Sequence, residues 1–121
     1  MTAADVAALA IRIGSARYRY RDELQLHDGI AAVLAAGGVT ARREVPLGDR
    51  CRIDFLVAGG IGIEVKVDGE AFAVWRQLQR YARRPDIRAL LLVTTRARHA
   101  AGAPAVLGDV PVTVLVLRGG L

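Results

Sequence analysis

The segment RCRIDFLVAGGIGIEVKV, residues 50–67, has the pattern of a β-hairpin. Two segments of alternating character, at 50–57 and 61–67, flank a loop of the sequence Ala-Gly-Gly at 58–60. A loop of this length and composition suits a three-residue hairpin connection. With Gly59 at the centre of the loop, we expect Val57 to pair with Ile61.

Polar side chains interrupt the hairpin at positions that this pairing brings together. Asp54 should lie opposite Glu64, and Lys66 should point the same way as Glu64, because side chains alternate along a strand. Directly opposed residues have Cβ atoms roughly 4.5–5.5 Å apart. The alternation predicts one face with Ile53, Phe55, Val57, Ile61, Ile63, Val65 and Val67, and another with Arg52, Asp54, Leu56, Gly62, Glu64, Lys66 and Asp68.

Two carboxylates at that distance repel each other unless a positive charge lies between them. A divalent cation such as Mg²⁺ or Mn²⁺ supplies the charge, with Asp54, Glu64 and the Val65 carbonyl as candidate oxygen ligands. Lys66 would then hold a water molecule or a phosphate oxygen beside the cation. This set suits phosphodiester hydrolysis, with Asp54, Glu64 and Lys66 as catalytic residues. The alternative is an exposed strand face that carries ordinary cross-strand charges.

The basic residues are nearly all arginines. Lys66 is the only lysine among 17 basic residues, which indicates either a position that needs a compact ammonium group or a chance survivor of biased composition. The net charge of +5 and the sequence pI of about 10.3 favour a polyanionic partner, with nucleic acid first.

The rest of the chain predicts an α/β fold in which helices flank a mixed sheet. We expect helices at 2–13, 17–36 and 72–83, further strands at 39–47, 89–94 and 110–117, and a loop or short helix at 99–107. Thr2 should cap the first helix, and two glycines at 37–38 should end the second. The 89–94 strand should be covered on both faces. The residues expected to face inward from the third helix are Phe72, Trp75, Leu78 and Ala82.

The length suits one domain over residues 1–121, with a helical extension at 1–16 and a core at about 22–94. No apolar run approaches the ~18 residues of a membrane-spanning helix. Asp5 and Arg12 interrupt any signal-peptide pattern. Cys51 has no partner for an internal disulfide and suits a small core position. We therefore expect a cytoplasmic protein with no membrane association.

Arg52-Ile53-Asp54, followed after nine residues by Glu64-Val65-Lys66, resembles the D-X(n)-E-X-K motif of the PD-(D/E)XK nuclease superfamily. Ile53 occupies the family's nominal proline position. The expected element order also resembles the restriction-endonuclease-like αβββαβ core of that family. The resemblance implies a Mg²⁺- or Mn²⁺-dependent deoxyribonuclease.

Two flanking features extend this resemblance. In the superfamily an acidic residue of the first core helix often joins the metal site, which points to Glu23, with Asp22 or His27 as alternatives. The RecB-like branch carries a Gln-X3-Tyr element on the helix after the ExK strand, and Gln77 and Tyr81 match it. Their i,i+4 spacing places both on one helical face. There Gln77 would join the catalytic residues, and both would contact the substrate.

Two groups of arginines are candidates for phosphate contacts, or else solvated basic faces. One is interleaved with tyrosines that can stack on bases, and the other lies on the third helix. The groups are Arg17, Tyr18, Arg19, Tyr20 and Arg21, and Arg76, Arg80, Arg83 and Arg84. From them we take Arg21, Tyr20, Arg80 and Arg84 as substrate-binding residues. We expect Glu44 to be an edge charge, with reach into the site from the first strand as the alternative. We expect His27 to be a surface helical residue or a proton shuttle, and His99 a loop residue.

The sequence thus predicts a DNA nuclease directed by DNA structure or ends, acting in repair or recombination. Endonuclease and exonuclease action both stay open. A homodimer or larger homo-oligomer, a helicase or another protein partner would be compatible with so small a domain. Two alternatives are a catalytically inactive nucleic-acid-binding or regulatory module on the same fold, and an assembly protein whose basic face binds an acidic partner.

Overall fold

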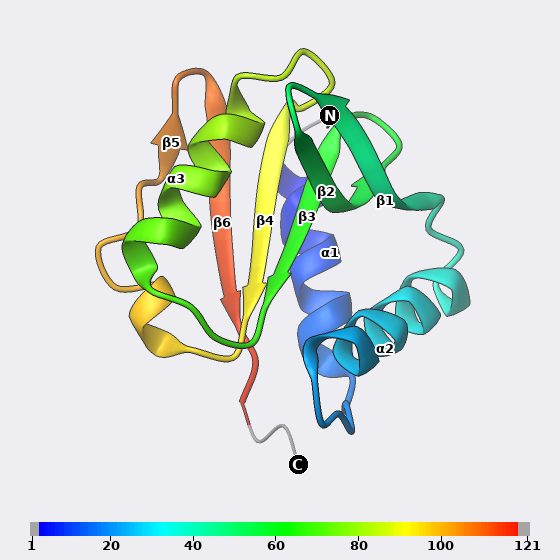
Figure 1. Ribbon diagram of the computed structural model, residues 1–121. Coiled ribbons are helices and arrows are strands. Elements are labelled where there is room, and N and C mark those ends of the chain that lie inside the picture. The colour runs from blue at the N-terminus through cyan, green and yellow to red at the C-terminus, as the bar shows by residue number, and fades with distance from the viewer. Residues whose placement is uncertain (1–2, 119–121) are drawn as a thin grey trace.

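The computed structural model describes residues 3–118 (Figure 1). Within this range it is an α/β protein with a six-stranded mixed sheet. The helices are α1 Ala3–Ser15, α2 Glu23–Ala36, α3 Ala71–Ala82 and the short 3-10 helix η1 Ala97–His99. The strands are β1 Ala41–Gly48, β2 Cys51–Val57, β3 Ile61–Lys66, β4 Ala89–Thr94, β5 Val106–Leu107 and β6 Val110–Val116.

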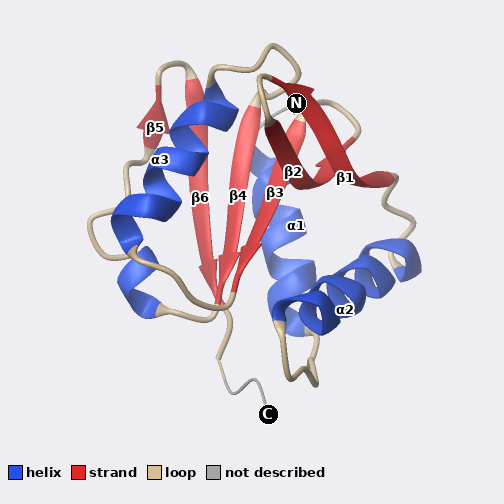
Figure 2. Cartoon of the chain, in the orientation of Figure 1, coloured by secondary structure: helices blue, strands red, loops and turns tan. Residues whose placement is uncertain are grey.

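The sheet has the strand order β1-β2-β3-β4-β6-β5. Strands β1, β2 and β3 pair antiparallel, β3, β4 and β6 run parallel, and β5 returns antiparallel to β6. Helix α3 covers one face, whereas α1 and α2 lie on the other (Figure 2). The predicted α/β class and mixed sheet between helices are therefore confirmed. No helix in the described range is long and apolar enough to cross a membrane.

Each face of the sheet carries its own apolar core. Leu26, Ile30 and Leu34 of α2 pack with α1 on one side, and Val74 and Leu78 of α3 pack on the other. Strand β4 contributes to both cores, since all six of its residues are buried, as its continuous apolar sequence predicts. Burial on both faces makes any charge within this sheet costly unless it has a partner.

The hairpin register agrees with the sequence. Val57 pairs with Ile61 and Phe55 with Ile63, and residues 58–60 form the turn. One predicted face is wrong, however, because Ile53 packs in the α3-side core while Phe55 packs in the core of α1 and α2. At residues 51–54, which precede Phe55, β2 pairs only with β1, so its side chains no longer alternate in step with those of β3.

Helix α2 begins six residues later than predicted. Asp22 is its N-cap, with φ −145° and ψ 176°, and its carboxylate accepts a hydrogen bond of 2.8 Å from the Gln25 N–H. The Gln25 side chain in turn accepts one of 2.6 Å from the Arg21 N–H. This capping arrangement fixes the start of the helix and leaves residues 17–22 outside it. The predicted C-terminal cap at Gly37 is confirmed, and the proposed cap Thr2 lies outside the described residues.

Two local predictions on the α3 side are also wrong. The buried residues of α3 are Val74, Leu78 and Tyr81, and Phe72 is 73% exposed. Phe72 precedes Val74 by two residues, which is about 200° around a helix, so it faces away. His99 is fully buried rather than an isolated loop residue. Its side chain contacts Thr94 Oγ1 at 2.6 Å and the Gly69 carbonyl at 2.7 Å.

Candidate functional site

The predicted acidic pair lies where β2 and β3 separate. The Val65 N–H donates to Asp54 Oδ2 at 2.8 Å, and the Asp54 N–H donates to Glu64 Oε1 at 3.3 Å. These are backbone donors of two strands that no longer pair with each other at this point. The two carboxylates replace the missing strand–strand hydrogen bonds, which is why two acids are tolerated inside the sheet.

Both carboxylates are deeply placed. The exposed fractions of the side chains are 13% for Asp54 and 4% for Glu64. Burial, and then the nearby Asp54 charge, raises the pKa of Glu64 to about 8. Burial also raises the pKa of Asp54, although its hydrogen bond from Val65 opposes that change. Near neutral pH this pair therefore needs either a proton or an added positive charge.

Lys66 supplies part of that charge. Its Nζ lies 3.5 Å from Glu64 Oε2, so the two side chains point the same way, as the alternation predicts. The side chain of Lys66 is 23% exposed, which leaves its ammonium group at the border between the buried pair and the solvent. An anion from the solvent can therefore reach Lys66 more easily than it can reach Glu64.

The predicted Gln77–Tyr81 pair adjoins the same carboxylate. Gln77 Nε2 donates to the Tyr81 hydroxyl at 2.8 Å, which confirms that both lie on one face of α3. That hydroxyl lies 3.0 Å from Glu64 Oε2 and 2.8 Å from the Arg52 carbonyl, and it can donate to either. Burial and the Glu64 charge raise the pKa of Tyr81, so it stays protonated. Because Tyr81 is only 1% exposed, it contacts Glu64 rather than the solvent.

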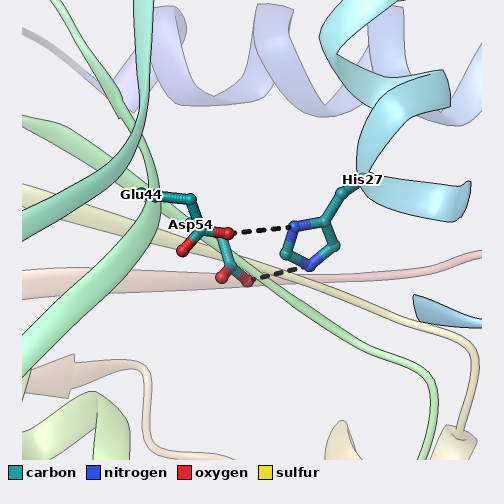
Figure 3. Close-up of side chains that lie close together, drawn as sticks. All are labelled: His27, Glu44 and Asp54. Carbon is teal, nitrogen blue, oxygen red and sulfur yellow. Dashed lines mark ion pairs between the residues drawn. The ribbon is translucent and has the colours of Figure 1, made fainter. Parts of the chain in front are cut away.

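His27 is a side chain of this cluster that the sequence interpretation misplaced. It is 5% exposed rather than a surface residue, and its Nε2 lies 3.3 Å from Asp54 Oδ2 (Figure 3). That buried nitrogen has no hydrogen-bond partner. The signal was present in the sequence, since His27 precedes the buried Ile30 and Leu34 at i+3 and i+7 spacing.

Two more acids flank His27. Glu23 Oε2 lies 3.7 Å from His27 Nε2, which places the predicted helix residue at the edge of the site. Glu44 Oε1 lies 3.9 Å from His27 Nδ1. Strand β1 is indeed a sheet edge, but the carboxylate of Glu44 lies beside the imidazole (Figure 3). Asp22 is engaged as the cap of α2 and does not join this group.

The predicted substrate-binding arginines fall in different places. Arg80 lines a hollow of about 220 Å³ next to Tyr81 and Gln77, together with Arg50 and Arg52. Arg84 instead is half-buried and lies against Gly48 at the end of β1.

Tyr20 and Arg21 lie in the connection between α1 and α2. Tyr20 lines a separate hollow of about 200 Å³, with Arg17, Tyr18 and Arg118 among its neighbours. Arg21 is exposed in the segment that leads into the helix of His27.

The donors at this position fit a divalent cation. Carboxylate oxygens from the half-buried Asp54 and the buried Glu64 suit Mg²⁺ and Mn²⁺, and the Val65 carbonyl lies between the two motif residues Glu64 and Lys66. His27 Nε2 supports this fit, because it lies 3.3 Å from Asp54 Oδ2 and has no hydrogen-bond partner, which is costly for a buried polar atom.

No protein-family model matches this chain, and no match was found among the curated proteins or among the solved structures. The assignment of a function therefore depends on the residues of the site and their chemistry.

Proposed function

We propose that this chain is a divalent-metal-dependent nuclease that hydrolyses DNA phosphodiester bonds on a fold of the PD-(D/E)XK, restriction-endonuclease-like type. One observation carries the proposal. At the point where β2 and β3 separate, the half-buried carboxylate of Asp54, the buried carboxylate of Glu64, the only lysine and a buried imidazole nitrogen without a hydrogen-bond partner lie together. A purely structural hairpin does not need this combination, because apolar residues would cover the sheet at a lower desolvation cost.

Asp54, Glu64 and the Val65 carbonyl would hold the cation, which is Mg²⁺ or Mn²⁺. When bound, it would stabilise negative charge on the phosphate and make water a better nucleophile. The hydrogen bond from the Val65 N–H to Asp54 holds the strand that carries Glu64 and Lys66 beside Asp54. The raised pKa of Glu64 supports the same role, because a carboxylate that resists ionisation alone ionises readily beside a cation.

Lys66 would contact the substrate directly. Its ammonium group is the half-buried positive charge next to Glu64, and it can hold a phosphate oxygen or orient the attacking water. A compact ammonium group suits a crowded position better than the broad guanidinium that the chain uses elsewhere.

Tyr81 and Gln77 would act mainly as positioning residues. The hydroxyl of Tyr81 fixes one oxygen of Glu64, and the amide of Gln77 fixes that hydroxyl. Partners that orient a ligand in this way commonly matter 10- to 100-fold for metal affinity or activity. Gln77 is half-buried and lines the arginine-rich hollow, so it also adjoins the expected path of the DNA backbone.

The DNA backbone would follow the arginines beside α3. Arg50, Arg52 and Arg80 adjoin Tyr81, which itself contacts Glu64, so these guanidinium groups lie within reach of phosphates near the scissile bond. So small a domain favours recognition of DNA structure or ends over long sequences. A homodimer, or a helicase or other partner, would add further contacts.

The decisive experiment is a cleavage panel with Mn²⁺ over linear duplex, single strand, flap and four-way junction. We expect cleavage of at least one substrate, none with EDTA, and a loss of about 10³-fold in Lys66→Ala. Glu70→Gln is a control, because Glu70 is exposed and makes no side-chain cap hydrogen bond.

Each other outcome has a definite meaning. Equal digestion by Lys66→Ala would overturn the role of Lys66. Salt-sensitive DNA binding without cleavage would favour the catalytically inactive module on the same fold. Absence of binding to any nucleic acid would favour an acidic protein partner instead.

A further inference from the structure

We propose that the outer face of α3 binds single-stranded DNA and that the ring of Phe72 stacks on one of its unpaired bases. The inference rests on the proposed nuclease function and deepens it, because it names the class of substrate. Its content is a base-binding position at the start of α3, at a residue that none of the sequence motifs includes.

Phe72 is the most exposed large apolar side chain within residues 3–118. It is 73% exposed, whereas Phe55, the other phenylalanine of the chain, is fully buried. Its neighbour is Trp75, the only tryptophan, at 6.1 Å between ring centroids and 53° between ring planes. The indole N–H of Trp75 donates to the His99 carbonyl at 3.2 Å, which holds that ring in place. One anchored aromatic ring thus supports a second ring that is open to the solvent.

Two arginines continue the same face along the helix. Phe72, Arg76 and Arg80 follow one another at i,i+4 spacing and are all exposed, so they form one stripe. Helix α3 contains no acidic residue, and within residues 3–118 neither arginine is in an ion pair. In Figure 1 no other described element crosses the outer side of α3. The stripe therefore offers two guanidinium groups to phosphates and one ring to a base.

The stripe leads to the proposed metal position. Two hollows adjoin along α3 and share Gln77 and Arg80. The first lies beside Tyr81, whose hydroxyl contacts Glu64, and the second, of about 440 Å³, extends to Arg76. The aromatic pair follows one helical turn further on. The whole stripe rises about 12 Å along the helix axis, which is long enough for a few nucleotides of a single strand.

The aromatic ring favours a single strand over a duplex. Aromatic side chains bind nucleic acid by stacking on bases, and only an unpaired, unstacked base exposes the face of its ring. Arginines alone would bind the backbone of either form. An apolar protein partner would need a continuous apolar patch, whereas two arginines follow the ring here. We therefore infer that single strands, overhangs and flaps are the substrates of this face.

The test is DNA binding in EDTA, where cleavage does not interfere. Fluorescence anisotropy measures the affinities for a labelled single strand of about ten nucleotides and for the blunt duplex of the same sequence. We expect the single strand to bind more tightly and to quench the fluorescence of Trp75, which lies next to Phe72. Phe72→Ala and Phe72→Leu should weaken single-strand binding about 10-fold and leave duplex binding unchanged. Phe72→Tyr should bind the single strand like the wild type, because it keeps the aromatic ring.

Two further variants serve as controls. Ile11→Ala removes a side chain that is 69% exposed on α1, on the other side of the sheet, and should leave both affinities unchanged. Arg76→Gln should weaken the binding of both DNA forms and lower the salt dependence of single-strand binding by about 0.7 in the slope of log K against log salt. The Tm of every Phe72 variant should equal that of the wild type, because the ring is exposed.

The outcomes separate this inference from the proposed function. Absence of single-strand binding by the wild type would overturn the base position. Wild-type affinity of Phe72→Ala would overturn it as well and would favour an apolar protein partner for the ring, and wild-type affinity of Phe72→Leu would exclude stacking. Lys66-dependent cleavage combined with unchanged binding by the Phe72 variants would leave the nuclease proposal without this position. Phe72-dependent binding without any cleavage in Mn²⁺ would overturn the nuclease proposal and retain the single-strand site.

Discussion

The two ends of the β2–β3 hairpin differ in almost every physical respect. At the turn end, three successive pairs from Val57↔Ile61 to Phe55↔Ile63 are joined by the strand ladder, and their side chains are buried and apolar or glycine. At the open end, around Glu64 of β3, the hydrogen-bond ladder between β2 and β3 has stopped. There the carboxylates of Asp54 and Glu64 accept the backbone N–H groups of Val65 and Asp54 instead.

The difference shows how one supersecondary unit separates stability from chemistry. Backbone pairing and apolar burial hold the turn end without any charge. The open end replaces that pairing with carboxylates, whose raised pKa values record the cost of their burial. The site is therefore expected to be a weak point of the metal-free fold, and cation binding should strengthen it.

Truncation at the turn end should have the largest effect on stability. Ile63 is fully buried, and Ile63→Ala should lower the free energy of unfolding by about 2–5 kcal/mol. Glu64→Gln, one residue away, should leave stability in EDTA level or higher while it abolishes cleavage. Urea unfolding measures the stability of both variants, and the cleavage rate per folded molecule measures their activity. If Glu64→Gln unfolded the chain as much as Ile63→Ala, the contrast between the two ends would be lost.

The pH dependence of stability should come from the open end. The pKa of Glu64 is raised from 4.5 to about 8, so between these values the folded chain binds more protons than the unfolded chain. Stability in EDTA should therefore fall as pH rises from 5 to 8, by on the order of 2 kcal/mol. Thermal melts would show this as a drop of several degrees that Mn²⁺ reverses. Glu64→Gln should flatten the profile, and a Tm that rises with pH in this window would contradict the assignment.

The smallest effect is expected from the hydroxyl of Tyr81. Tyr81→Phe removes the hydrogen bond to Glu64 and should reduce kcat about 10-fold, or about 1.4 kcal/mol, with little change in KM. Tyr18→Phe is the matched control, because it also loses one hydroxyl hydrogen bond, at the Ile13 carbonyl. It should lower Tm without an effect on kcat. A rise in KM with unchanged kcat in Tyr81→Phe would place that residue against the substrate instead.

Interactions close in sequence were predictable. The hairpin register follows from a three-residue loop, and the approach of Asp54 to Glu64 follows from that register. The hydrogen bond between Gln77 and Tyr81 follows from helical spacing. Each of these depends on a fixed geometric period, which the order of residues alone determines.

Only the tertiary structure decided what lies across from this local unit. Strand β2 stops pairing with β3 before Phe55, and there Ile53 packs on the α3 side, which simple alternation from the hairpin does not predict. The docking of α2 brought His27 to Asp54, and the carboxylate of Glu44, whose backbone is left-handed, lies beside the same imidazole. Sequence therefore determined the acidic pair and its lysine through local periodicity. The wider polar cluster depends on how distant elements pack, because His27, Glu44 and Asp54, which span 27 residues of sequence, meet only in the folded chain.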